Sequence, residues 1–192
     1  MRTGVVVLAL AAMLPGATSA RAASARLDFH VADAFLTDLT GVPQTGARAQ
    51  TADAAHVIRF SGSGAFVVGS AAASGGGVWA HTSGTDGDLF AFGTWTATAP
   101  LSFEPFGCGG DGIPATACGG ILELAVHLSG THVSIGPEEV DGVLTIVSGI
   151  GPDAPAGIED AIAFTPMGVP IDFVVGLSDP GGATLFGSKS AA

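Results

Sequence analysis

The feature that most constrains the fold of this chain is a recurring type of segment, a short run of alternating apolar residues bounded by Gly, Pro or Asp. In the clearest run, ILELAVHL at 121–128, every even-numbered position is Leu or Val, whereas Glu123 and His127 fall on odd positions. A period of two is typical of a β-strand with one buried face. Similar runs lie at 56–69, 78–82, 89–98, 131–135, 142–148, 159–165, 171–177 and 183–186.

Turn-forming residues separate these runs at short intervals, which favours antiparallel strands because the connections are too short for crossover helices. The chain is 47% hydrophobic and 12% charged, a balance typical of a folded domain. Only residues 31–39 show helical spacing, and the polar stretch 40–54 is predicted to be a loop. Glycines within the strand-like runs suit the bends of a barrel. The sequence therefore predicts an all-β fold, an antiparallel β-barrel or β-sandwich of roughly eight to ten strands with at most one short N-terminal helix.

The N-terminus has the layout of a secretory signal peptide. Arg2 precedes an apolar run at 5–14, and small residues follow in A-x-A order at 20–22. The apolar run is too short to span a bilayer as a helix, and no later stretch resembles a membrane anchor. We therefore expect cleavage after Ala22, with Ala20 or Ala25 as alternatives. The remaining residues 23–192 would form a single all-β domain that is secreted or periplasmic.

The only two cysteines, Cys108 and Cys118, lie in a glycine-rich stretch at 105–120. In an exported chain such a pair most often forms a structural disulfide, which would pin this stretch as a loop with Asp111 at its tip. A redox pair would normally be spaced as C-x-x-C. A zinc site with His127 and His132 is the other alternative, but the cysteines lack the spacing of a zinc finger.

The charge of the chain limits its partners. The formal net charge is −11, and no Lys or Arg occurs between Arg59 and Lys189. Nucleic-acid binding and attachment to anionic membranes both rely on clustered Lys and Arg, so both are excluded as expected functions. The partners that remain are a small or apolar ligand, or another surface protein.

Candidate catalytic residues are few, because phosphate-binding loops, dinucleotide fingerprints, nucleophile elbows and zinc-protease motifs do not occur. His81 and His127 are the candidate bases, and Glu104 and Glu123 are the candidate carboxylate partners. Glu123 and His127 share one face of a strand but lie about 13 Å apart along it. The partner of either histidine must therefore come from another strand.

Two acidic segments, at 85–88 and 137–141, offer closely spaced carboxylates of the kind that Ca2+ prefers. Neither segment alone supplies six oxygen ligands, and solvated turn residues are the alternative interpretation. A turn at 128–131 would also bring His127 and His132 together as a possible pair of metal ligands. No other cofactor is expected. The candidate Ca2+ ligands are Asp86, Asp88, Glu138, Glu139 and Asp141.

Two tryptophans, Trp79 and Trp95, are candidate ligand-binding residues, with closure of the core as the alternative. Trp95 lies on the parity opposite Phe90 and Phe92, so one of these faces must be outside or line a cavity. The first functional hypothesis is a non-catalytic exported domain that binds a ligand or makes surface contacts. The second is a secreted enzyme with a pocket that pairs a histidine with a carboxylate.

Overall fold

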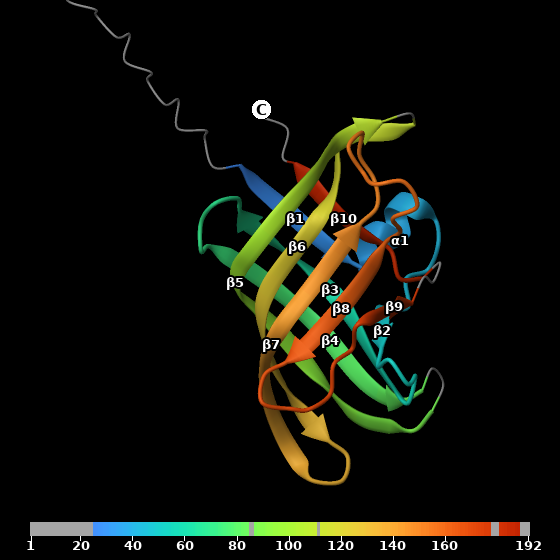
Figure 1. Cartoon of the computed structure of the whole chain (residues 1–192), viewed down its shortest axis with the longest axis vertical. Helices are drawn as coiled ribbons and strands as arrows, with labels where there is room; N and C mark the ends of the chain where they lie inside the picture. Colours follow the sequence, from blue (N-terminus) through green and yellow to red (C-terminus); the bar gives the residue numbers. More distant parts are fainter. Residues whose placement is uncertain (1–24, 85–86, 111, 178–180, 189–192) are drawn as a thin grey trace, which may run out of the picture.

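The computed structural model describes residues 25–84, 87–110, 112–177 and 181–188 (Figure 1). It is an antiparallel sheet of ten strands with one short helix, and this confirms the predicted all-β class. The elements in chain order are β1 (Arg26–Val31), α1 (Ala34–Thr40), β2 (Ala47–Gln50), β3 (His56–Val67), β4 (Ala73–Ser83), β5 (Leu89–Gly110), β6 (Ile113–His132), β7 (Gly136–Ser148), β8 (Ala161–Pro166), β9 (Val175–Leu177) and β10 (Thr184–Ser188).

The strands close into a ring, which we call the barrel. β1 pairs with both β3 and β10, β10 pairs with β6, and β6 returns to β3 through β5 and β4. β2 pairs with the half of β3 that β1 leaves free, and β9 pairs with β2. On the other side, β7 pairs with β6, and β8 pairs with β7. Phe164 in β8 and Phe173 before β9 exchange two backbone hydrogen bonds of 2.9 Å, which join these two sides.

Alternation along the strands fills the interior of the barrel. On β6 the predicted apolar row is buried and Glu123 is exposed, as the period of two requires. Trp95 packs against Phe29 and Phe60, with ring centroids 6.2 and 6.0 Å away, and all three side chains are fully buried. Glycine makes room in this core at Gly64, where an added Cβ would lie 2.5 Å from Cζ of Phe29.

Two strands at the start of the domain were not predicted. β1 was not recognised as a strand, although it closes the barrel between β3 and β10. β2 lies within residues 40–54, which the sequence predicted to be a loop. Its buried residues are Ala47 and Ala49, whose small side chains give little apolar periodicity. The expected loop is therefore wrong over these residues.

The stretch that holds the cysteines is a β-hairpin and not a loop. β5 continues to Gly110, β6 begins at Ile113, and Cys108 lies directly opposite Cys118 across the pair. The predicted disulfide is present, with the two Cα atoms 3.9 Å apart. Asp111, at the predicted tip, lies outside the described residues. The disulfide therefore joins two paired strands near the end of the longest hairpin.

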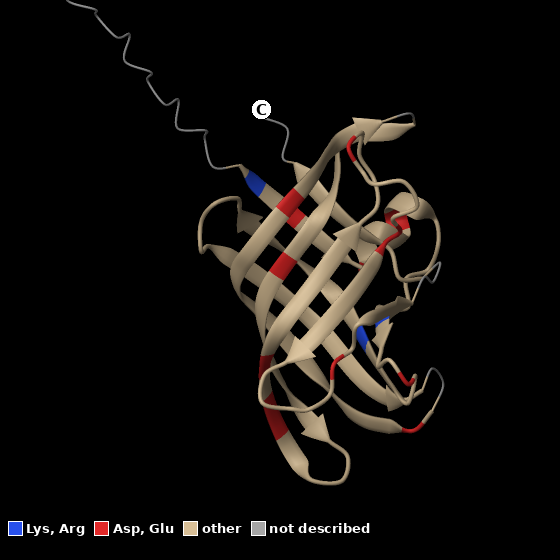
Figure 2. Ribbon diagram, in the orientation of Figure 1, with Lys and Arg blue, Asp and Glu red and all other residues tan. Residues whose placement is uncertain are grey.

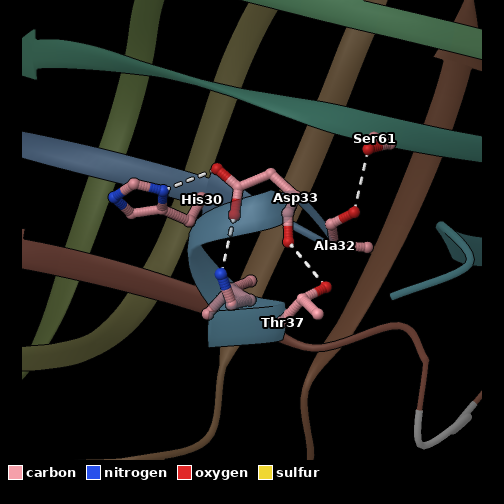
Figure 3. A network of polar contacts seen from close by, with 6 residues as sticks. His30, Ala32, Asp33, Thr37 and Ser61 are labelled. Carbon is pink, nitrogen blue, oxygen red and sulfur yellow. Dashed lines mark hydrogen bonds and ion pairs between the residues drawn. The ribbon is translucent and has the colours of Figure 1, made fainter. Parts of the chain in front are cut away.

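The single helix follows β1, as the helical spacing predicted, and is anchored to the barrel by polar contacts (Figure 3). Asp33 caps α1, because its Oδ1 accepts a hydrogen bond from the backbone N–H of Leu36 at 3.1 Å. Its Oδ2 lies 2.7 Å from Nδ1 of His30, and Ser61 of β3 donates to the carbonyl of Ala32 at 2.8 Å. This histidine–carboxylate pair thus has a structural role at the start of the helix.

Candidate functional site

A cavity of about 260 Å3 lies at the end of the barrel where β6 turns into β7. This turn is at the bottom of Figure 1. β3, β4, β6, β7 and β8 contribute to its walls, together with residues 169–173. Most of the lining is apolar, and three polar side chains, His81, His132 and Glu138, complete it. The main apolar residues are Ile58, Trp79, Leu128, Val140, Phe164 and Phe173.

The period of two places these polar groups in the cavity. Along β4, Trp79 and His81 are two residues apart and line the same cavity. On β6, Leu128 and His132 are four residues apart, and on β7 Glu138 precedes Val140 by two. The inward-facing row of each strand therefore ends in a polar residue at the same end of the barrel.

His81 is held by aromatic neighbours and by a second histidine. Nδ1 of His56 lies 3.0 Å from Nε2 of His81, and the rings of Phe90 and Phe173 lie 5.1 and 5.3 Å from the His81 ring. Burial, followed by the nearby charges of His56 and His132, lowers the pKa of His81 to about 4. The imidazole of His81 is therefore neutral at physiological pH.

Glu138 projects inward beside a position that has no side chain. It lies opposite Gly130 across the β6–β7 pair, and a Cβ added to Gly130 would lie 2.8 Å from Cζ2 of Trp79. Oε2 of Glu138 is buried and has no hydrogen-bond partner among the described residues. Glycine at position 130 thus leaves room for both the carboxylate and the indole ring.

The indole of Trp79 is fixed in place at the cavity wall. Its Nε1 donates a hydrogen bond of 3.1 Å to the backbone carbonyl of Thr94, and only 5% of the residue is exposed. Trp95, the other candidate, is 1% exposed, and its Nε1 donates to the carbonyl of Ser61. The structure therefore places Trp79 on the cavity and Trp95 in the core.

The rim of the cavity is apolar and exposed. Ile135, in the turn between β6 and β7, is 76% exposed, and Val169, after β8, is 38% exposed. Val133 and Met167 are also exposed in the same two turns. The sequence predicted a strand at 131–135, but β6 runs only to His132 and residues 133–135 form the turn. Ile135 and Val169 line the cavity, and Val133 and Met167 add exposed apolar surface in the same two turns.

The acidic segment at 137–141 is the start of β7 and not a loop. Alternation turns Glu138 inward, whereas Glu139 and Asp141 are exposed on the outer face. The outer carboxylates hold His127, with Nε2 of His127 2.8 Å from Glu139 and Nδ1 2.7 Å from Asp141. The hydrogen bond with Asp141, aided by the one with Glu139, raises the pKa of His127. The three predicted Ca2+ ligands of this segment therefore lie on opposite faces of one strand.

The expected approach of His127 to His132 does not occur. Residues 128–131 are continuous strand within β6, so His132 lines the cavity while His127 lies outside it. Within the described part of the chain, no group of three or more His, Cys, Asp or Glu side chains is arranged to hold a metal ion. Asp88 is exposed, and Asp86 lies outside the described residues.

The two remaining catalytic candidates lie away from the cavity. Glu104 is exposed on β5, and Glu123 is exposed on β6, where its Oε2 accepts a hydrogen bond of 2.8 Å from Ser102. The contact of His56 with His81 and the position of Glu138 in the cavity were not predicted from the sequence. Glu138 and Val140 are two residues apart, so the strand period could have indicated that both face the interior.

Acidic side chains are spread over the molecule, and Lys and Arg are few (Figure 2). Among the described residues the basic ones are Arg26, Arg48 and Arg59, and none of them lines the cavity. No helix in the described ranges is long and apolar enough to cross a membrane. Comparisons with protein-family models, with curated proteins and with solved structures find no match to this chain. The proposed function therefore rests on the geometry of the cavity.

Proposed function

We propose that this protein is an exported domain that binds a small apolar ligand in the cavity at the end of the barrel. The observation that carries the proposal is the cavity itself, about 260 Å3 in volume and walled mainly by aromatic and aliphatic side chains with three polar groups. Small-molecule sites have this composition, with a few polar groups that orient an otherwise apolar ligand. Ile135 and Val169, which line the cavity and are exposed, would favour entry of such a ligand from water.

Export is supported by two independent features. The first is the signal-peptide pattern at 1–22, which lies outside the described residues. The second is the disulfide between Cys108 and Cys118, a bond that persists in oxidising compartments outside the cytoplasm. We therefore propose a secreted or periplasmic location for the mature domain.

A secreted enzyme is the second candidate, because His81, His132 and Glu138 line the same cavity. Two observations favour binding over catalysis. Across the described residues of the cavity, no hydrogen bond joins a histidine to a carboxylate. A pKa of about 4 also makes His81 a weak general base at neutral pH.

The proposal is tested by titrating 1-octanol, a neutral probe, into the protein by isothermal calorimetry. Val140 faces the cavity and Val143 lies on the opposite face of the same strand, so Val140→Phe and Val143→Phe form a matched pair. We expect 1-octanol to bind the wild type and the V143F variant, whereas V140F fills the cavity and abolishes binding. Equal binding by the two variants would contradict the proposed site.

A further inference from the structure

We infer that the cavity selects an apolar amine, a hydrocarbon or aromatic group that carries one ammonium. This inference rests on the proposed function and specifies the ligand class of the same site. Its starting point is Glu138, whose buried Oε2 has no hydrogen-bond partner among the described residues while the side chain lines the cavity. Buried polar atoms are nearly always paired in folded proteins, so an unpaired acceptor that faces a cavity indicates a missing donor.

The neighbours of Glu138 do not supply that donor. Its cross-strand partner is Gly130, which has no side chain, and Nε1 of Trp79 is engaged with the carbonyl of Thr94. His81 shares its Nε2 with His56. His132 also lines the cavity; its Nδ1 accepts a hydrogen bond from the N–H of Ser134, and it makes none to Oε2 of Glu138. A bound ligand can therefore supply the donor that pairs with this oxygen.

The charge around the cavity favours a cationic donor. No Lys or Arg in the described part of the chain lines the cavity, and the full chain carries a formal net charge of −11. A ligand carboxylate would face Glu138 without a cation to compensate, whereas an ammonium would form a charge-assisted hydrogen bond with it. The cavity therefore distinguishes ligands by the sign of their charge.

The aromatic wall supports the same choice. Trp79 is fixed beside Gly130, the residue opposite Glu138, and both Trp79 and Glu138 line the cavity. Ammonium groups are attracted to the faces of aromatic rings, and most strongly to that of Trp. Phe164 and Phe173 extend the apolar wall, where the hydrocarbon part of the ligand would pack.

The volume limits the size of the ligand. At about 30 Å3 for each water-sized group, a cavity of about 260 Å3 holds roughly eight or nine non-hydrogen atoms. Octylamine, 1-octanol and octanoate match this size, and each has one hydrocarbon chain. Octylamine and 1-octanol carry the same octyl chain and differ in the charge of the terminal group, so their comparison isolates the contribution of Glu138. Octanoate, whose carboxyl carbon replaces one carbon of that chain, tests the opposite charge at nearly the same size.

The test is calorimetric titration of these three probes at pH 7 into the wild type and into Glu138→Gln and Glu139→Gln. Both substitutions remove one carboxylate and keep its shape, but Glu138 faces the cavity and Glu139 is exposed outside it. We expect octylamine to bind the wild type about 10-fold more tightly than 1-octanol, with octanoate weakest. E138Q should weaken octylamine about 10-fold and change 1-octanol by less than about 3-fold, whereas E139Q should leave all three within about 2-fold.

Two results would overturn the inference and leave the proposed function intact. One is equal binding of octanoate and octylamine to the wild type, and the other is the same octylamine affinity in E138Q and E139Q while 1-octanol still binds. Failure of all three probes to bind the folded wild type would contradict both proposals. The thermal unfolding midpoint of each variant, measured alongside, shows that any lost affinity belongs to a folded protein.

Discussion

Nδ1 of His56 and Nε2 of His81 lie 3.0 Å apart on the neighbouring strands β3 and β4, and His81 lines the cavity. Phe90 lies against both rings. Burial of this pair disfavours a charged imidazole at His81, and its pKa falls to about 4 from the ordinary 6.5. A histidine that stays neutral adds no positive charge to the cavity wall at physiological pH.

The lowered pKa of His81 predicts that the domain loses stability as pH falls. The unfolded chain takes up a proton at His81 near pH 6.5, but the folded chain does so only near pH 4, so the stabilisation is present above 6.5 and is lost between these values. Because His81 is only partly buried, solvent reduces the loss to about 1–2 kcal/mol.

Thermal unfolding between pH 4 and 8 measures this effect, with His81→Gln as the comparison. The groups that face His81 include His56, His132 and Glu138, and they are retained in both proteins. Between pH 7 and pH 4, we expect the unfolding temperature of the wild type to fall further than that of H81Q. Parallel pH profiles of the wild type and H81Q would contradict the lowered pKa of His81.

The disulfide should stabilise the domain by restricting its unfolded state. Closing the 10-residue separation between Cys108 and Cys118 contributes about 2–3 kcal/mol in the chain-entropy model. Replacing both cysteines with Ala should therefore lower the unfolding free energy by that amount in urea denaturation. The unreduced wild type should resist alkylation even when unfolded, and two modified thiols without reduction would show that the bond is absent.

Asp160 should be required for the junction between β7 and β10. Oδ1 accepts a hydrogen bond of 2.9 Å from the N–H of Gly149, and Oδ2 accepts one of 3.1 Å from the N–H of Thr184. An amide has only one acceptor oxygen, so Asp160→Asn loses one bond and places its NH2 against a backbone donor. We expect a loss of about 1–3 kcal/mol by urea unfolding.

Asp153 provides the control for this substitution, because it is exposed in the same connection between β7 and β8. Asp153→Asn should change the unfolding free energy by less than about 0.5 kcal/mol. Burial raises the pKa of Asp160, which means that its ionised form is already disfavoured in the fold. Equal stabilities for D160N and D153N would show that the two backbone bonds contribute nothing.

Glu138 should reduce the stability of the empty protein. Its buried oxygen has no partner among the described residues, so replacing it with Met removes an unpaired polar group from an apolar wall. Glu138→Met should raise the unfolding free energy by about 1 kcal/mol and weaken octylamine binding about 10-fold. Glu139→Met, on the outer face, should do neither, and a destabilised E138M would show that the carboxylate supports the fold instead.

The strands with strong alternation were predictable from the sequence, and the ring closure was not. The inward row of β6 was predicted because Leu and Val alternate with Glu and His over eight residues. β2 was missed because its inward residues are Ala47 and Ala49, whose small side chains give a weak pattern. The hairpin at 105–118 was missed because glycine suppresses both the strand pattern and the expectation of order.

The candidate site was only partly predictable for a related reason. Sequence parity shows which residues of one strand share a face, but not which strands are neighbours. His81 and Glu138 were each proposed as functional residues, but their shared cavity depends on the pairing of β4 through β5 and β6 to β7. His56 was overlooked because its contact with His81 depends on the register between β3 and β4.

Native mass spectrometry of the mature protein from its own host, with and without a chelator, is the most direct test of ligand binding in the cavity. We expect a chain that begins at Ala23, lacks two hydrogens because of the disulfide, and carries a small bound mass. This mass should survive chelation and be absent from Val140→Phe. A bound mass that is lost on chelation, or a wild type without bound mass like V140F, would contradict apolar ligand binding in the cavity.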